Sequence, residues 1–265
     1  MNKKENCPKC KGLGWIRTRK GVIKCDCAYL NITNTIFHRM NIPRRYREKD
    51  FNNFQIITDE HKKVLKKLNE YIMSDKIFEG NGLFLYGRPG VGKTHLAVAI
   101  LKELFKKRKV VGLFYDTRTL LFDLKATFDG SSSGREILDE VVKAPILVLD
   151  DLGSERLSDW ARDILHYIIV KRYNELLPII ITSNIDISGK SDTIFEDTLE
   201  ERMGSSIASR IFEVCEKVEV KGDDYRKSTL SQLEKETNLK LTKLKELKIE
   251  KGRNKKRNQR NTDRG

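Results

Sequence analysis

A glycine-rich loop between an apolar run and a helix-forming run constrains the fold of this 265-residue chain more than any other feature. The apolar residues 83–86 precede Gly87, four residues separate Gly87 from Gly92, and a lysine and a threonine follow directly. This spacing is the P-loop pattern, and a strand before the loop with a helix after it is the context that the pattern requires. The residues expected to bind a nucleotide are Gly87, Arg88, Pro89, Gly90, Val91, Gly92, Lys93, Thr94 and His95.

Each residue type in this loop has a chemical role. The glycines let backbone N–H groups turn toward phosphate oxygens, and the N-terminus of the following helix adds partial positive charge. We expect Lys93 to neutralise the outer phosphates and the hydroxyl of Thr94 to bind Mg²⁺. A plain glycine turn is the competing interpretation, but the strand and helix on either side favour the P-loop.

Two further apolar runs end in polar residues suited to the same site. The run 145–149 ends in Asp150 and Asp151, which is the Walker B form. A parallel strand buried on both faces is a continuous apolar run, and an acid at its carboxyl end emerges beside the P-loop. We expect Asp150 to hold Mg²⁺ and Asp151 to polarise the attacking water, with helix capping as the alternative for either. The run 178–183 ends at Asn184, which is either a water-orienting residue or an ordinary turn asparagine.

Four of the five cysteines fall within the first 27 residues. Cys7 and Cys10 form a C-x2-C pair, and Cys25 and Cys27 form a C-x-C pair after a predicted hairpin that brings the pairs together. In a reducing compartment this spacing favours a tetrahedral thiolate Zn²⁺ site over disulfides. Free thiols and an iron–sulfur cluster are the alternatives. A segment this small needs the metal to fold, because it cannot bury enough apolar surface alone.

Strand and helix patterns alternate over the rest of the chain, which predicts an α/β fold with a parallel sheet covered on both faces. The basic segment 41–51, taken alone, is typical of a linker, and residues 129–134 are typical of a flexible loop. Further strands are expected at 110–115 and 212–220. Helices are expected at 28–40, 60–73, 95–107, 119–128, 160–173, 199–211 and 224–251.

Composition and charge limit the classes of function. No apolar run is long enough to span a membrane and none follows the charged N-terminus, so we expect a cytoplasmic protein without a signal peptide and with no membrane partner. The net charge is +14. Residues 1–50 carry 13 lysines and arginines against 4 acids, and residues 239–265 carry 11 against 3, which gives +9 and +8 and leaves −3 for the rest. The basic ends favour a polyanion or an acidic protein as partner, with solvated ends as the alternative.

The order of these motifs resembles the AAA+ ATPases of the DnaC/DnaI helicase-loader and IstB group, and the resemblance covers roughly Ile42 to Arg226. It implies an AAA+ P-loop NTPase fold, ATP, Mg²⁺ and a homo-oligomer with ATP sites completed between subunits. Asn184 matches sensor 1, Arg210 the arginine finger and Arg226 sensor 2. Arg202 is the alternative finger, since both arginines are expected on one helix. Aspartate at position 151, where glutamate is common, suits slow hydrolysis and a switch.

The resemblance also implies a division of the chain and a function. Residues 1–45 resemble the zinc-binding, helicase-interacting module of the loaders, residues 46–227 an AAA+ ATPase domain, and residues 228–265 form a basic C-terminal helix and tail. The implied function is ATP-dependent loading of a replicative DNA helicase onto single-stranded DNA. One alternative is an IstB-type transposition helper that binds duplex DNA and recruits a transposase. Another is a regulatory ATPase whose basic ends bind RNA.

Overall fold

The structure is a computed structural model that describes residues 7–11, 13, 15–18, 21–25, 35–127, 132–154, 157–185, 187 and 198–227. The chain divides into two compact units, Met1–Gly222 and Asp223–Gly265. None of the helices within the described ranges is long and apolar enough to cross a membrane. The predicted helix 224–251 lies outside the described residues except at 224–227, of which 225–227 are helical.

A five-stranded parallel sheet forms the centre of the first unit, with the strand order β4-β5-β6-β3-β7. The predicted parallel sheet is therefore confirmed. Because β5, β6 and β3 are neighbouring parallel strands, the three predicted polar motifs that follow them lie together at the carboxyl end of the sheet. The strands are β3 (Gly82–Tyr86), β4 (Leu113–Asp116), β5 (Leu147–Asp150), β6 (Ile179–Ser183) and β7 (Cys215–Glu219).

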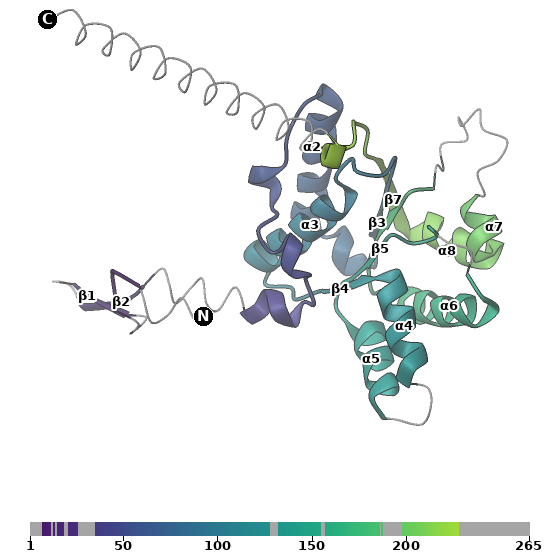
Figure 1. The fold of residues 1–265 in the computed structure, drawn as a ribbon, viewed down its shortest axis with the longest axis horizontal. Coiled ribbons are helices and arrows are strands. Elements are labelled where there is room, and N and C mark those ends of the chain that lie inside the picture. The colour runs from purple at the N-terminus through teal and green to yellow at the C-terminus, as the bar shows by residue number, and fades with distance from the viewer. Residues whose placement is uncertain are drawn as a thin grey trace, which may run out of the picture. The chain divides into compact units, whose positions relative to one another are not determined.

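Alternate residues of each strand enter two hydrophobic clusters, one on each face of the sheet. Leu83 and Leu85 belong to the cluster that contains α2 and α3, whereas Phe84 belongs to the cluster that contains α4 to α8. This alternation follows from the two-residue period of a strand, and it confirms that helices cover both faces (Figure 1). The helices are α2 (Asp59–Met73), α3 (Lys93–Arg108), α4 (Thr117–Thr127), α5 (Ser132–Lys143), α6 (Asp159–Asn174), α7 (Leu199–Met203) and α8 (Ser205–Val214).

The segment that precedes α2 is packed against this core. Phe37 and Met40, at the end of a helix described over 35–39, are 6% and 0% exposed. The N–H of Phe114 in β4 donates to the carbonyl oxygen of Met40. Buried Lys102 of α3 donates to two backbone carbonyl groups of residues 47 and 49. The linker interpretation of residues 41–51 is therefore wrong, because α3 binds this segment through Lys102 and β4 binds the residue directly before it.

The helix α5 was not predicted, and its first turn overlaps the predicted loop 129–134. Serine and glycine are weak helix formers and suggest a loop on their own. The apolar side chains of Ile137, Leu138 and Val141 nevertheless lie in the second cluster, where α5 packs against α4 and α6. Tertiary packing therefore overrides the local propensity at Ser132 and Gly134.

The predicted helix 199–211 is two helices, α7 and α8, because Gly204 between them has φ 90° and ψ 146°. A helix cannot continue through that conformation. The helix α8 then runs to Val214, so β7 begins at Cys215 and not at residue 212. Strand β4 likewise begins at Leu113 and not at residue 110, since its partner strand begins opposite it at Leu147.

The predicted N-terminal hairpin is confirmed. Strands β1 (Trp15–Thr18) and β2 (Gly21–Lys24) pair antiparallel, with Trp15 opposite Lys24 and Thr18 opposite Gly21. The hydroxyl of Thr18 donates to the carbonyl oxygen of Gly21 across the turn. This hairpin separates Cys7 and Cys10 from Cys25 along the sequence.

Candidate functional site

The P-loop leaves β3 at Gly87, whose φ of 142° suits glycine. A Cβ atom at Gly87 would lie 2.3 Å from the carbonyl oxygen of Val220, so the loop and the residue after β7 are in direct contact. Lys93 is 7% exposed, and its Nζ donates to the carbonyl oxygens of Gly87 at 2.8 Å and Arg88 at 2.9 Å. The ammonium group is therefore held within the loop that the sequence assigns to phosphate binding.

Asp150, at the end of β5, lies beside Thr94 of α3. The Thr94 hydroxyl donates to Oδ2 of Asp150 at 3.1 Å, and the Thr182 hydroxyl donates to Oδ1 at 2.6 Å. Burial raises the pKa of Asp150 to about 6, although the hydrogen bonds from Thr182 and Thr94 oppose this shift. A hydroxyl and a carboxylate side by side are the hard oxygen ligands that Mg²⁺ prefers, so these residues fit that ion.

Asn184 connects two of the other predicted residues. Its Nδ2 donates to Oδ1 of Asp151 at 2.6 Å, and its Oδ1 accepts from Nζ of Lys93 at 2.7 Å. Lysine only donates and an ionised aspartate only accepts, which fixes the orientation of the amide. Asp151 has a left-handed backbone with φ 59°, and its N–H donates to the Thr182 hydroxyl at 2.8 Å. The Lys93–Asn184–Asp151 chain thus spans the ends of β3, β5 and β6.

The remaining residues of the predicted loop differ in their surroundings. Val91 is 1% exposed and belongs to the core, while Arg88 and Pro89 are exposed and Gly90 has φ 84°. The imidazole Nε2 of His95 forms a hydrogen bond of 2.8 Å with the carbonyl oxygen of residue 50. Burial lowers the pKa of His95. Its side chain therefore ties α3 to the preceding segment of the chain.

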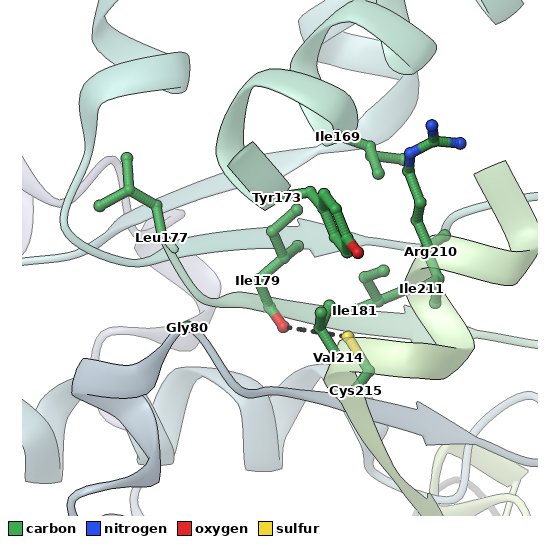
Figure 2. A pocket seen from close by; sticks show the side chains of 10 residues that line it. All are labelled: Gly80, Ile169, Tyr173, Leu177, Ile179, Ile181, Arg210, Ile211, Val214 and Cys215. Carbon is green, nitrogen blue, oxygen red and sulfur yellow. Dashed lines mark hydrogen bonds between the residues drawn. The ribbon is translucent and has the colours of Figure 1, made fainter. Parts of the chain in front are cut away.

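Arg210 lies on α8 and lines a small cavity together with Ile179 and Cys215, the first residues of β6 and β7. Its guanidinium group donates to the carbonyl oxygen and hydroxyl of Ser206 at 2.9 and 2.6 Å, and lies 5.8 Å from the ring centroid of Tyr173. Figure 2 shows the group extending away from Cys215, whose thiol lies across a small cavity of about 10 Å³. That cavity has room for no more than a water molecule and cannot hold a nucleotide.

The alternative finger and the sensor 2 residue lie elsewhere. Arg202 is on α7 and donates to the carbonyl oxygen of Gly153, two residues after Asp151. The prediction that Arg202 and Arg210 share one helix is wrong, since Gly204 separates them. Arg226 belongs to the second unit, where its Nε donates to Oδ1 of Asp224 at 3.3 Å. Its role as sensor 2 stays a prediction.

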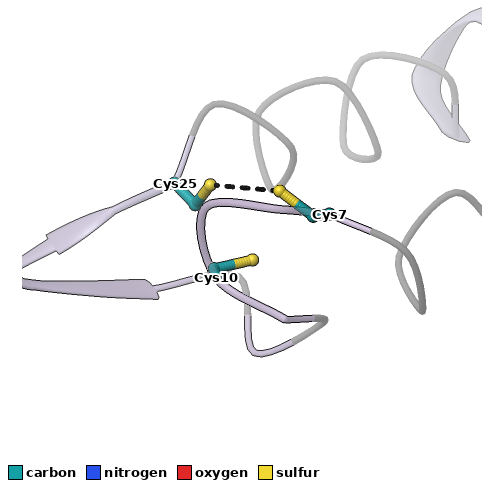
Figure 3. Close-up of side chains that lie close together, drawn as sticks. All are labelled: Cys7, Cys10 and Cys25. Carbon is teal, nitrogen blue, oxygen red and sulfur yellow. Dashed lines mark hydrogen bonds between the residues drawn. The ribbon is translucent and has the colours of Figure 1, made fainter.

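Three of the four N-terminal cysteines lie together at the base of the hairpin (Figure 3). The sulfur atoms of Cys7, Cys10 and Cys25 are all within 4.8 Å of one another, and those of Cys7 and Cys25 are 3.8 Å apart. Tetrahedral zinc–thiolate bonds of about 2.3 Å place sulfur atoms about 3.8 Å apart, so the spacing fits such an ion. Cys27 lies outside the described residues.

Thr182 binds both aspartates of the site and was not predicted from the sequence. Its hydroxyl accepts from the N–H of Asp151 and donates to the carboxylate of Asp150. The available signal was a threonine at the end of the isoleucine run 179–181, where a hydroxyl interrupts an otherwise apolar strand. Thr117, whose hydroxyl donates to the carbonyl oxygen of Asp150, was missed as well and had no comparable signal.

A P-loop, an acid pair and an asparagine at adjacent carboxyl ends of a parallel sheet define this chain as a P-loop nucleotide-binding protein. The family described as IstB-like ATP binding protein matches residues 34–233. The chain therefore belongs to the IstB-like ATP-binding family, and the resemblance stated above is confirmed.

One curated relative and one solved structure carry names from DNA replication. The chain is 27% identical over 175 residues to the replicative helicase loader DnaC of Escherichia coli strain K12, a match that covers 64% of this chain and 70% of DnaC. A crystal structure of the DnaC helicase loader matches with a TM-score of 0.61 and 40% identity, over 68% of this chain and 100% of that chain. The uncharacterized protein YqaM of Bacillus subtilis is 29% identical over 204 residues, 72% of this chain but only 60% of YqaM.

Proposed function

We propose that this protein is an ATP-dependent loader that delivers a replicative DNA helicase to single-stranded DNA. The observation that supports it most is the Lys93–Asn184–Asp151 chain, placed on a fold that matches the DnaC helicase loader. In this proposal the P-loop and Lys93 bind the phosphates of ATP, while Thr94 and Asp150 bind Mg²⁺. Bound Mg²⁺ supplies charge neutralisation at the phosphates.

Hydrolysis is assigned to residues that already contact one another. Asp151 would accept a proton from the attacking water, and Asn184 would orient that water together with the carboxylate. The aspartate side chain is shorter than the glutamate found in most AAA+ proteins, and Asn184 already restrains it at 2.6 Å. Both features favour slow hydrolysis, so ATP acts here as a switch between two states of the loader.

The N-terminal cysteines are proposed to hold one structural Zn²⁺, with Cys27 as the fourth ligand beside Cys7, Cys10 and Cys25. The 3.8 Å separation of the Cys7 and Cys25 sulfur atoms supports this assignment. Four thiolates would leave no open coordination position. The ion would therefore stabilise the hairpin and take no part in catalysis.

The hairpin region is proposed to dock on the helicase, because it exposes apolar side chains. Leu13, Val22 and Ile23 are 76%, 63% and 53% exposed. Exposed apolar side chains on a small rigid element are typical of a protein-binding surface. Phe37 and Met40, by contrast, lie in the ATPase core. Within the predicted module 1–45, helicase binding is thus assigned to the residues before the helix at 35–39.

Binding to the cognate replicative helicase tests this division of labour. We expect a variant that lacks residues 1–33 to keep its core and lose helicase binding, because the deletion spares Phe37 and Met40. It should still bind single-stranded DNA, with affinity that falls steeply as salt rises. The double substitution V22D/I23D should weaken helicase binding while zinc content is retained.

A matched control uses an exposed apolar residue outside the hairpin. Leu176 is 62% exposed, and Leu176→Asp should leave helicase binding unchanged. Unchanged helicase binding after deletion of residues 1–33 would contradict the docking proposal. Preference of the full protein for duplex DNA, with ATP-dependent filaments and recruitment of a transposase, would favour the transposition helper instead.

A further inference from the structure

The aromatic ring of Phe54 lies directly against the P-loop. Phe54 is 6% exposed and follows the short helix η2 (Phe51–Asn53), in the segment that precedes α2. A Cβ atom at Gly92 would lie only 2.7 Å from Cε2 of this ring. Gly92 precedes Lys93, caps α3 and has φ 102°. The ring is therefore in contact with the backbone that must direct its N–H groups at a phosphate.

Two imidazole rings hold Phe54 edge-on. The ring centroids of His95 and His61 lie 5.3 and 5.5 Å from that of Phe54, with interplanar angles of 82° and 83°. His95 is bonded to the carbonyl oxygen of Asp50, and the Asp50 side chain caps η2. The ring is thus fixed from both α2 and α3, and the backbone that carries it is fixed by a cap.

His61 extends this contact to the other side of the P-loop. Its Nδ1 accepts from the N–H of Ile57 at 3.1 Å, so the proton lies on Nε2, which donates to the carbonyl oxygen of Lys221 at 2.6 Å. The preceding residue, Val220, is the one whose carbonyl oxygen contacts Gly87. Packing therefore supports the P-loop at its first glycine and, through Phe54, at its last.

We propose that Phe54 is a positioning residue for nucleotide binding, which sets the backbone of Gly92 and the start of α3 in the geometry that binds phosphate. This positioning role adds to the ATP-binding role proposed above and rests on that role. Phe54 acts through Gly92 and is itself no phosphate ligand. Removing the ring frees the backbone at Gly92, and the loop then loses the alignment of its N–H groups.

A purely structural role is the competing explanation, and Phe37 is the matched control. It is also 6% exposed and lies in the same hydrophobic cluster. It packs on Phe105, with 6.5 Å between ring centroids. Phe105 is twelve residues beyond Lys93 on α3, a distance of about 18 Å along the helix. Truncation of Phe37 therefore removes the same side chain from the same core, but far from the loop.

The test measures the dissociation constant for Mg²⁺-ATP, with a fluorescent ATP analogue, in wild type and three variants. All measurements are made at a temperature at which each of the four proteins is folded. Phe54→Ala should weaken ATP binding by about tenfold or more. Phe54→Leu, which keeps part of the contact, should show an intermediate affinity, and it decides the question if Phe54→Ala does not fold. Phe37→Ala should lower the melting temperature comparably while its ATP affinity stays within about twofold of wild type.

The outcomes separate this inference from the proposed function. Wild-type affinity in both Phe54 variants, or an equal loss of affinity in Phe37→Ala, would overturn the positioning role of Phe54. Failure of the wild type itself to bind ATP would instead contradict the proposed function.

Discussion

Replacing Asn184 with alanine removes the side chain that connects Lys93 to Asp151. Two hydrogen bonds are lost, one of 2.6 Å to Asp151 and one of 2.7 Å to Lys93. A hydrogen bond to a charged group contributes about 1.5–3 kcal/mol. We expect the bond to Asp151 to matter most in the transition state, where it orients the carboxylate, and about 1.4 kcal/mol corresponds to a tenfold change in rate. The rate of ATP hydrolysis should therefore fall about 10-fold to 100-fold.

Affinity for ATP should change much less, because Lys93 keeps its bonds to Gly87 and Arg88. The assay is single-turnover hydrolysis of radiolabelled ATP at saturating enzyme, with the dissociation constant measured separately. Asn81→Ala is the matched control, since Asn81 directly precedes β3, at the opposite end of the strand from the P-loop. Hydrolysis by Asn184→Ala at the wild-type rate would refute the role of this contact.

Four further changes test other parts of the account. Lys93→Ala should abolish ATP binding while the fold persists, and Arg210→Ala should lower turnover far more than affinity for ATP. If Arg210 acts on a neighbouring subunit, mixing the two variants should restore some ATPase activity. No recovery despite normal assembly would place the arginine finger at Arg202. Arg172→Met should lower the free energy of unfolding by about 3–5 kcal/mol, because fully buried Arg172 donates to four backbone carbonyl groups of residues 141, 142, 144 and 178. A urea unfolding midpoint equal to that of wild type would contradict this role of Arg172. Metal analysis should find about one zinc per chain, and a chelator should make the four N-terminal thiols reactive. Cys215 should react only after unfolding, because burial raises the pKa of its thiol to about 12. Zinc-free protein with an ordered hairpin would contradict the zinc site.

Much of the nucleotide site was predictable because each motif ends a strand of strong apolar character. The runs that end at Gly87, Asp150 and Asn184 define neighbouring parallel strands, and parallel strands bring their carboxyl ends to one edge. The contacts among these residues were not predictable. Asn184 contacts both Lys93 and Asp151, and Asp151 has a left-handed backbone, which has no sequence signal of its own.

Other features depended on packing between distant segments. The basic residues of 41–51 suggested a linker, yet the apolar residues just before them are buried on β4 and α3. The role of Phe54 depends on contacts with Gly92 and with histidines from two helices, which the sequence places up to 41 residues away. Helix α5 forms because its apolar face packs, in spite of a serine- and glycine-containing first turn.

The most direct test of the proposed function is a helicase-loading assay with the cognate replicative helicase and single-stranded DNA. The measured quantity is the rate of unwinding of a duplex next to a single-stranded region, with and without this protein and ATP. We predict that unwinding depends on the protein, and that Lys93→Ala and the deletion of residues 1–33 each abolish the stimulation. Equal unwinding with and without the protein would contradict the assignment as a helicase loader.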